Sequence, residues 1–313
     1  MGLKTICMKV KVGVVQEHPV FFNKKGTIDK IETLLSENVK EAYDLMVFPE
    51  SFIPGYPRGF TFGATIGKRS EEGRQLYAEY HKNSIDLEGD SLKRLEKLSK
   101  IYKTYLVIGV TERTASNGSL HCSMLYISPS NGLLGVHRKI KPTGTERVVW
   151  SEASGEDLVT FNTSIGKLGG LICWENYMPL ARMAMYQKGI QIYIAPTADA
   201  RESWVASMRH IALEGRCFVL GCNQFITKDM YPAEYQDLLR EEEDMMCPGG
   251  SVIVSPGGEV MAGPLWNTNG ILTAILDLED IYRQKLDFDV NGHYSRKDIF
   301  EFRVKDQPPI QDE

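Results

Sequence analysis

The sequence predicts a single-domain α/β protein. Short apolar runs typical of β-strands alternate with stretches whose apolar residues recur at helical spacing. No Pro/Gly/Ser-rich linker, change in composition or internal repeat divides the 313 residues. Hydrophobic residues make up 42% and charged residues 25%, the balance of a globular chain whose core needs neither disulfides nor a structural metal.

The N-terminal half is expected to hold three strands and two amphipathic helices. The predicted strands are 9–16, 45–48 and 105–110. The predicted helices are 27–42 and 91–102, each with an apolar stripe along one face. Asn117-Gly118 and Asn131-Gly132 then indicate hairpin turns between further β-like segments.

The C-terminal half continues the alternation of strands and helices. A short strand, Gly169 to Cys173, precedes a helix that begins near Met178 and ends at Gly189. A second helix, 203–216, has Ser203 as its expected N-cap. The remaining predicted strands are 190–195, 218–222, 251–254 and 271–276, with a Pro-Gly-Gly turn at 256–258 between the last two.

Two segments are expected to lie outside the compact core. Residues 227–248 lack apolar periodicity and are predicted to form a long surface excursion. The tail after Leu286 is polar and rich in charge. We therefore expect one domain over residues 1–286 and a C-terminal extension over 287–313.

Composition excludes several classes of partner. The net charge of −5 comes from 36 basic and 41 acidic residues spread along the chain, which does not favour nucleic acid or an anionic membrane. No apolar stretch approaches the ~20 residues of a membrane-spanning helix, and residues 1–10 lack a leader-like hydrophobic core. Six scattered cysteines without a Cys-x-x-Cys pair favour a cytoplasmic protein with reduced thiols. The six histidines show no metal-ligand spacing, so no metal is expected.

Three apolar runs end on chemically useful residues. Leu45 to Pro49 leads into Glu50, and Gly169 to Ile172 leads into Cys173. Leu133 to Val136 runs into a basic segment that contains Lys139 and Lys141. Because ligands of open α/β sheets bind beyond the carboxyl ends of strands, such residues can converge from distant positions.

These residue types suit nucleophilic catalysis. A cysteine attacks as a thiolate, a glutamate can take the thiol proton and later deprotonate water, and a lysine can stabilise developing negative charge. Each residue also has a simpler interpretation, since buried cysteines mostly serve packing and lysines are mostly solvated. Lys139 and Lys141 share a strand face, so spacing does not choose between them.

Around these residues the sequence resembles the nitrilase superfamily, and specifically its nitrilase branch. The resemblance extends from Val12 to about Arg296. Four motifs carry it in order: Phe48-Pro49-Glu50 continuing to Gly59, His137-Arg138-Lys139 continuing to Trp150, Cys173-Trp174-Glu175 continuing to Leu180, and Ala195 to Asp199. One departure is the loop after Trp150, which reads Ser151 to Asp157 where the family commonly has a Gly-rich acidic turn; this leaves substrate size open.

The resemblance implies a role for each matching residue. Glu50 would be the general base, Lys139 the stabiliser and Cys173 the nucleophile. Glu146 matches a further acid beside these three, holding Lys139 or a water. The substrate-side positions correspond to aromatic residues: Tyr56, Trp150 and Trp174.

The resemblance also implies a fold and an assembly. The fold is an αββα sandwich of two mixed β-sheets between outer helix layers. Related enzymes associate as homo-oligomers through the helix after the nucleophile, here Tyr177 to Lys188, and nitrilases often extend into spirals. The 227–248 segment and the C-terminal extension are candidates for additional contacts.

The expected activity is hydrolysis of a small organic nitrile to the carboxylic acid and ammonia, through a thioimidate and a thioester and without a cofactor. An amidase or carbamoylase of the same superfamily is the nearest alternative. Trp174-Glu175-Asn176 after the cysteine and the Gly55 to Gly59 run favour nitriles. Hydration of a nitrile or of cyanide that stops at the amide is a further alternative. A catalytically silent scaffold is less favoured, because all three reactive residues are retained.

Overall fold

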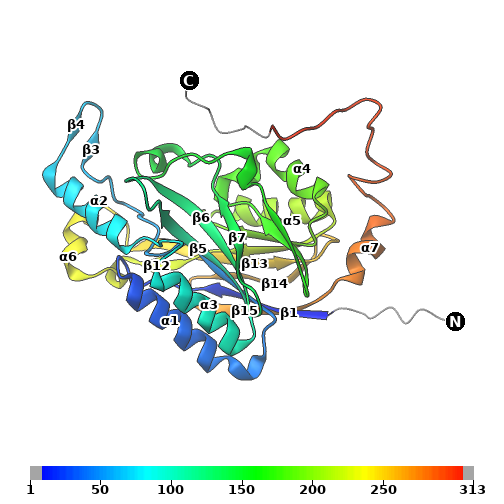
Figure 1. Ribbon diagram of the computed structural model, residues 1–313, viewed down its shortest axis with the longest axis horizontal. Helices are drawn as coiled ribbons and strands as arrows, with labels where there is room; N and C mark the ends of the chain where they lie inside the picture. Colours follow the sequence, from blue (N-terminus) through cyan, green and yellow to red (C-terminus); the bar gives the residue numbers. More distant parts are fainter. Residues whose placement is uncertain (1–8, 306–313) are drawn as a thin grey trace.

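The structure is a computed structural model, and it describes residues 9–305 of the chain. Two mixed β-sheets pack face to face, and a small two-stranded hairpin of β3 (Ala64–Thr65) and β4 (Lys68–Arg69) projects at one end (Figure 1). The two sheets and their flanking helices form the predicted αββα sandwich.

The first sheet has the strand order β15-β1-β2-β5-β6-β7. Its central pairs β1–β2 and β2–β5 are parallel, and its outer pairs are antiparallel. Asn117-Gly118 and Asn131-Gly132 do connect antiparallel neighbours, as predicted. The strands are β1 (Lys9–Gln16), β2 (Leu45–Ile53), β5 (Tyr105–Arg113), β6 (Leu120–Ser128), β7 (Gly132–Arg138) and β15 (Gly270–Asp277).

The second sheet has the order β12-β13-β11-β10-β9-β8, with β14 paired to β13. Its parallel centre consists of β9, β10 and β11. The strands are β8 (Thr160–Thr163), β9 (Gly166–Gly170), β10 (Ile192–Pro196), β11 (Phe218–Cys222), β12 (Phe225–Thr227), β13 (Met245–Val254) and β14 (Val260–Trp266).

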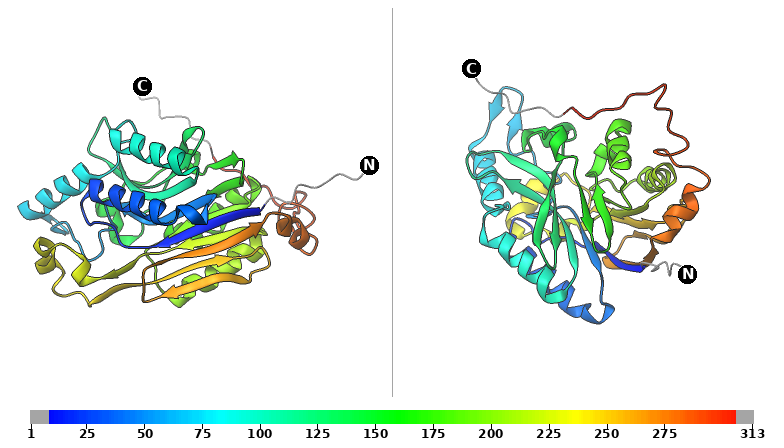
Figure 2. Two further views of the ribbon diagram at one scale, coloured as in Figure 1. Left: turned by 90° about the horizontal axis from the view of Figure 1, so that it is seen from below. Right: turned by 45° about the vertical axis from the view of Figure 1, so that its right-hand side comes forward.

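Helices cover the outer face of each sheet. The helices α1 (Lys24–Glu37) and α3 (Asp90–Tyr102) bury Ile31, Leu95 and neighbouring apolar residues against the first sheet (Figure 2). The helices α4 (Pro179–Gln187) and α5 (Glu202–Gly215) pack on the second sheet. Alternate strand residues facing the other way, such as Val47 and Ile194, meet in a third core between the sheets. Two more helices are α2 (Glu71–Asn83) and α7 (Glu279–Lys285).

Several predicted boundaries were wrong for local reasons. The helix predicted over 27–42 begins at Lys24 and ends at Glu37, so Val39 lies in a separate 3-10 turn and is exposed. Helix α5 begins one residue before Ser203, and its N-cap position is Arg201. The Pro-Gly-Gly turn leads from β13 into β14, a strand that the sequence analysis missed. The strand predicted over 169–173 ends at Gly170.

The predicted excursion over 227–248 is more ordered than expected. It contains the short helix α6 (Ala233–Gln236) and the first residues of β13. Its residues Tyr231 and Leu239 are buried and pack with Phe21 and Cys247 in a small separate core. A short segment can bury a few such anchors without helical or strand periodicity, which explains the error.

The tail beyond α7 lacks regular structure up to residue 305, although Phe302 and Val304 pack partly against the core under α4 and α5. Within residues 9–305, no helix is both long and apolar enough to cross a membrane. Cys7 lies outside the described residues.

Candidate active site

Glu50 lies inside β2, where the parallel pairing with β5 is interrupted between Phe48 and Ile53. Its backbone oxygen accepts a hydrogen bond from Gln224 Nε2 at 2.6 Å. Its side chain is fully buried. One carboxylate oxygen, Oε2, has no hydrogen-bond partner within residues 9–305, so it remains available to receive a proton.

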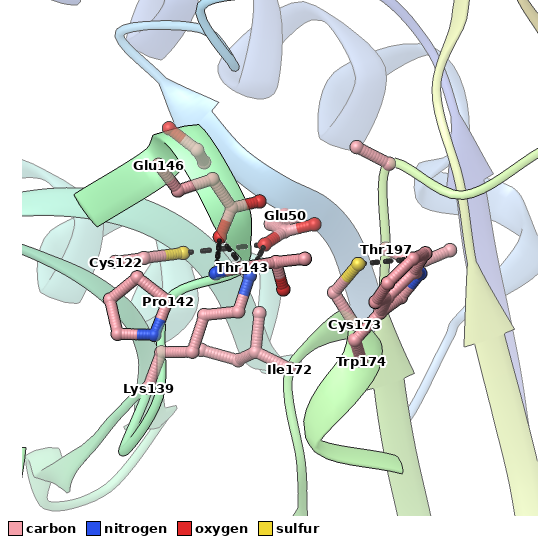
Figure 3. Close-up of polar contacts among 12 residues, drawn as sticks. Glu50, Cys122, Lys139, Pro142, Thr143, Glu146, Ile172, Cys173, Trp174 and Thr197 are labelled. Carbon is pink, nitrogen blue, oxygen red and sulfur yellow. Dashed lines mark hydrogen bonds and ion pairs between the residues drawn. The ribbon is translucent and has the colours of Figure 1, made fainter. Parts of the chain in front are cut away.

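Lys139 follows β7 directly, and its backbone N–H still donates to Cys122 O at 2.8 Å. Its buried ammonium donates to Glu50 Oε1 and to Glu146 Oε2, both at 2.8 Å (Figure 3). Glu146 lies in the 3-10 helix η2 (Gly144–Val148). Lys141, the alternative lysine, is exposed and pairs with Glu152. The structure therefore places Lys139 at the site and Lys141 outside it.

Cys173 begins the 3-10 helix η4 (Cys173–Tyr177), three residues after β9 ends. Its φ of 51° lies in the left-handed region, which non-glycine residues rarely adopt and which is often found at functional positions. The side chain is 4% exposed, and Sγ accepts a hydrogen bond from Thr197 Oγ1 at 3.2 Å. Figure 3 shows Cys173, Glu50 and Lys139 around one space.

Burial dominates the electrostatics of these groups. It raises the pKa of the Cys173 thiol to about 12, and the negative charge of Glu50 adds to the increase. Burial also raises the pKa of the Glu50 carboxyl, because the attraction of Lys139 only partly offsets it. For Lys139, burial opposes the charged form, but the neighbouring acidic groups, Glu50 foremost, outweigh it, so the pKa of the ammonium lies well above its usual value. Burial thus favours the neutral thiol and strengthens Glu50 as a base, while Lys139 is held as a cation.

A cavity of about 440 Å³ opens onto Cys173. Tyr56 and Trp174 form two of its walls, and Glu146 lines it as well. The Tyr56 hydroxyl donates to Glu146 Oε1 at 2.8 Å, while the Trp174 ring is 43% exposed. This volume accommodates a small organic molecule beside the sulfur.

Trp150 does not line this cavity. It lines a neighbouring cavity of about 430 Å³ that shares Tyr56, Arg58 and Glu146 with the first. The indole is almost fully buried, contacts the Tyr56 ring edge-on at 5.6 Å between centroids, and lies 5.8 Å from Lys139 Nζ. Trp150 therefore contacts Tyr56 and Lys139 but does not line the cavity at Cys173.

A buried ion pair links the segments that carry Lys139 and Cys173. His137 Nε2 lies 2.9 Å from Glu175 Oε2, and His137 Nδ1 lies 2.7 Å from the Asp157 carbonyl oxygen. The Glu175 carboxylate also accepts the backbone N–H groups of Ile140 and Ile172, each at 2.7 Å. Since both ring nitrogens face acceptors, the imidazole carries two protons. The Glu175 carboxylate thus holds both Ile140, directly after Lys139, and Ile172, directly before Cys173.

Sequence reasoning missed several residues around the site. It did not predict the Thr197 contact with Cys173, the buried His137–Glu175 pair, or Arg58, whose Nη2 donates to the Ala198 carbonyl. Asp199 accepts a hydrogen bond from the Trp174 indole at 2.9 Å and pairs with Arg201. Thr197 and Asp199 do fall in the Ala195 to Asp199 motif at the end of a strand, the one signal that pointed to them. Within residues 9–305, no group of three or more His, Cys, Asp or Glu side chains is arranged to hold a metal ion.

The fold and the Glu–Lys–Cys site define a class of hydrolase, and comparison with known families identifies it. The carbon–nitrogen hydrolase family model matches residues 11–285. The chain therefore belongs to the carbon–nitrogen hydrolase family and is an enzyme of that class.

Curated relatives show which members of the family the chain is similar to. The chain is 47% identical over 305 residues to a bifunctional nitrilase/nitrile hydratase of Lupinus angustifolius, covering 96% of this chain and 87% of the relative. It is 46% identical over 301 residues to an aliphatic nitrilase of Sinorhizobium fredii, covering 96% and 97%. Among solved structures, a nitrilase-superfamily protein of Saccharomyces cerevisiae has the same fold, with a TM-score of 0.74, 20% identity and coverage of 94% and 100%.

Proposed function

We propose that this enzyme hydrolyses a small organic nitrile to the carboxylic acid and ammonia, with Cys173 as nucleophile, Glu50 as general base and Lys139 as charge stabiliser. The observation that carries the proposal is that these three groups surround one space beside a cavity of about 440 Å³ that Cys173 lines. The names of the relatives, nitrilase and nitrilase/nitrile hydratase, support the nitrile as substrate.

The first half of the reaction forms a covalent intermediate. Glu50 Oε2 takes the thiol proton while Sγ attacks the nitrile carbon, and the nitrile nitrogen receives that proton to give a thioimidate. Lys139, held between two carboxylates, and the backbone N–H of Trp174 stabilise the charge that develops. Each such donor typically contributes about 3 kcal/mol to transition-state stabilisation.

The second half releases the products. Glu50 deprotonates a water whose oxygen adds to the thioimidate carbon, and both protons of that water pass in turn to nitrogen, so that the C–N bond breaks and ammonia leaves a thioester. A second water cleaves the thioester in the same way, and the sulfur regains its proton. Two waters are consumed for each nitrile hydrolysed to acid.

Hydration to the amide is a second outcome of the same site. If the C–S bond of the first tetrahedral intermediate breaks before the C–N bond, the amide leaves after a single water has been added. The bifunctional names of several relatives favour this product as a companion to the acid. An amidase or carbamoylase activity would use the same three residues on a C–N single bond.

A nitrile panel tests the proposal. Aliphatic, aryl and arylacetic nitriles, cyanide and the cognate amides would be assayed for ammonia, acid and amide, with Cys173→Ala and Cys217→Ala as a matched pair. Cys217 is also buried but lies in the core under α4 and α5. We expect release of ammonia from nitriles that Cys173→Ala abolishes and Cys217→Ala leaves unchanged. Turnover of amides alone, or full activity of Cys173→Ala, would contradict the proposal.

We also propose self-association through the face formed by α4 and the C-terminal tail. Leu180 on α4 is 70% exposed and Phe300 is 72% exposed. Both line a groove of about 680 Å³ between α4 and residues 290–302. An exposed apolar face of this kind favours contact with another protein surface, here a second copy of the chain.

A further inference from the structure

Two features of the site oppose ionisation of the Cys173 thiol. The sulfur is buried beside a carboxylate, and both conditions oppose a thiolate. The Lys139 ammonium has three N–H donors, and two of them are directed at Glu50 and Glu146. A further donor to the sulfur comes from the second sheet.

The register of the parallel strands places Thr197 next to Cys173. Strands β9 and β10 pair Gly170 with Ile194, so three residues further along each chain lie Cys173 and Thr197. The distance between Thr197 Oγ1 and Cys173 Sγ is 3.2 Å, and Figure 3 shows this contact. Thr197 is fully buried, and its backbone N–H donates to Cys222 O at 2.9 Å. The hydroxyl is therefore held in place by the sheet itself.

The direction of the hydrogen bond follows from the second partner of the hydroxyl. Thr197 Oγ1 accepts the backbone N–H of Asp199 at 2.9 Å. A hydroxyl has one proton and two lone pairs, so the Asp199 N–H occupies a lone pair and leaves the proton to donate. Within residues 9–305, Cys173 Sγ is the one acceptor that the Thr197 hydroxyl contacts. Thr197 thus donates to the sulfur.

Asp199, which lines the cavity, is itself held in place by several contacts. Its carboxylate holds the Trp174 indole at 2.9 Å and pairs with Arg201, and its carbonyl oxygen accepts a hydrogen bond from Asn223. The Asp199 N–H is thereby aimed at Thr197 by contacts on both sides. The hydroxyl proton needs little reorganisation to meet a charge that appears on sulfur, which is the condition for effective electrostatic stabilisation.

We propose that Thr197 is a further catalytic residue, whose hydroxyl stabilises the Cys173 thiolate as it forms and again as it leaves the thioester. A thiol sulfur is a weak acceptor and a thiolate a strong one, so the hydrogen bond strengthens as negative charge develops. This inference rests on the proposed nucleophilic role of Cys173.

The test compares variants that differ only in the hydroxyl. Thr197→Val keeps the shape of the side chain, and Thr197→Ser keeps the donor. The rate of alkylation of Cys173 by iodoacetamide at pH 8 would be followed by peptide mass spectrometry, with kcat/KM for a nitrile measured alongside. A hydrogen bond to a charged group typically corresponds to about a ten- to hundredfold effect on rate. We expect that loss in Thr197→Val for both readouts, and near wild-type values in Thr197→Ser.

Thr27→Val is the matched control, since Thr27 is an equally buried hydroxyl donor on α1, in the outer helix layer. It should lower thermal stability without changing thiol reactivity. If Thr197→Val folds poorly, Thr197→Ala against Thr197→Ser isolates the hydroxyl in the same way.

Wild-type alkylation in Thr197→Val, or equal losses in the serine and valine variants, would overturn the proposal. The alkylation readout needs no substrate, so a failed nitrile assay and a failed role for Thr197 can be told apart.

Discussion

Glu50 divides its two carboxylate oxygens between different tasks. Oε1 is held by Lys139 at 2.8 Å, whereas Oε2 has no partner within residues 9–305. The raised pKa of this carboxyl, caused by burial, makes its anion a stronger base than an exposed glutamate. One oxygen therefore positions the side chain and the other is free to move protons.

Replacing Glu50 tests its role as general base. Glu50→Gln preserves the size of the side chain and an oxygen for Lys139, but it cannot accept a proton. We expect kcat/KM for a nitrile to fall about 10²- to 10⁴-fold, the usual contribution of a general base. Glu152→Gln, which alters an exposed glutamate paired with Lys141, serves as the control and should keep full activity. A Glu50→Gln enzyme within a few-fold of wild type would rule out the assigned base.

The strand-end pattern predicted Glu50, Cys173 and one of two lysines, and the family resemblance chose Lys139, but two details of the site needed coordinates. The alternation of side chains along a strand would put Lys139 and Lys141 on one face. Strand β7 ends at Arg138, however, so this alternation does not apply to the two lysines. Thr197 meets Cys173 through the register of β9 with β10, and a single sequence does not specify which strands pair. Residues that depend on register were therefore beyond prediction.

At the scale of elements, the His137–Glu175 pair joins the end of β7 to the turn that carries the nucleophile. Both side chains are fully buried, so the pair is shielded from solvent and salt. Burial alone would lower the pKa of His137, but the Glu175 charge and hydrogen bond raise it above the usual value. The folded protein consequently binds this proton more tightly than the unfolded chain does.

This difference predicts a pH-dependent contribution to stability. It is fully present below the unfolded pKa of about 6.5 and is lost as pH rises through the higher folded pKa. His137→Gln should therefore lower the free energy of unfolding by about 3 kcal/mol at pH 6 and by less at pH 9, measured by urea denaturation. His293→Gln, at an exposed histidine, should show no such trend. An equal loss at both pH values would contradict a protonated His137.

Elements with strong periodicity were predicted better than their ends. Strands β1 and β11 match the predicted ranges, and α3 begins one residue early. Helix α1 ends at Glu37 because Asn38 closes it, although the apolar spacing continues to Ala42. Strand β14 was missed because all of its residues are exposed or only partly buried, so it lacks a clear apolar face.

At the scale of the whole molecule, the face between α4 and the tail is where we expect other copies to bind. Leu180→Asp would place a charge in the middle of this exposed apolar region. We expect a lower mass by size-exclusion chromatography with light scattering, with circular dichroism unchanged. Ile275→Asp, at a 57% exposed residue of β15, is the matched control and should keep the wild-type mass. Wild-type mass in Leu180→Asp would place the contact elsewhere.

The reactive groups come from both halves of the sandwich. Glu50 and Lys139 belong to the first sheet, on β2 and just beyond β7, while Cys173 and Thr197 follow β9 and β10 of the second. The four groups therefore come together only where the two sheets are docked. A chain in which the sheets have separated keeps each residue but loses the site that they form.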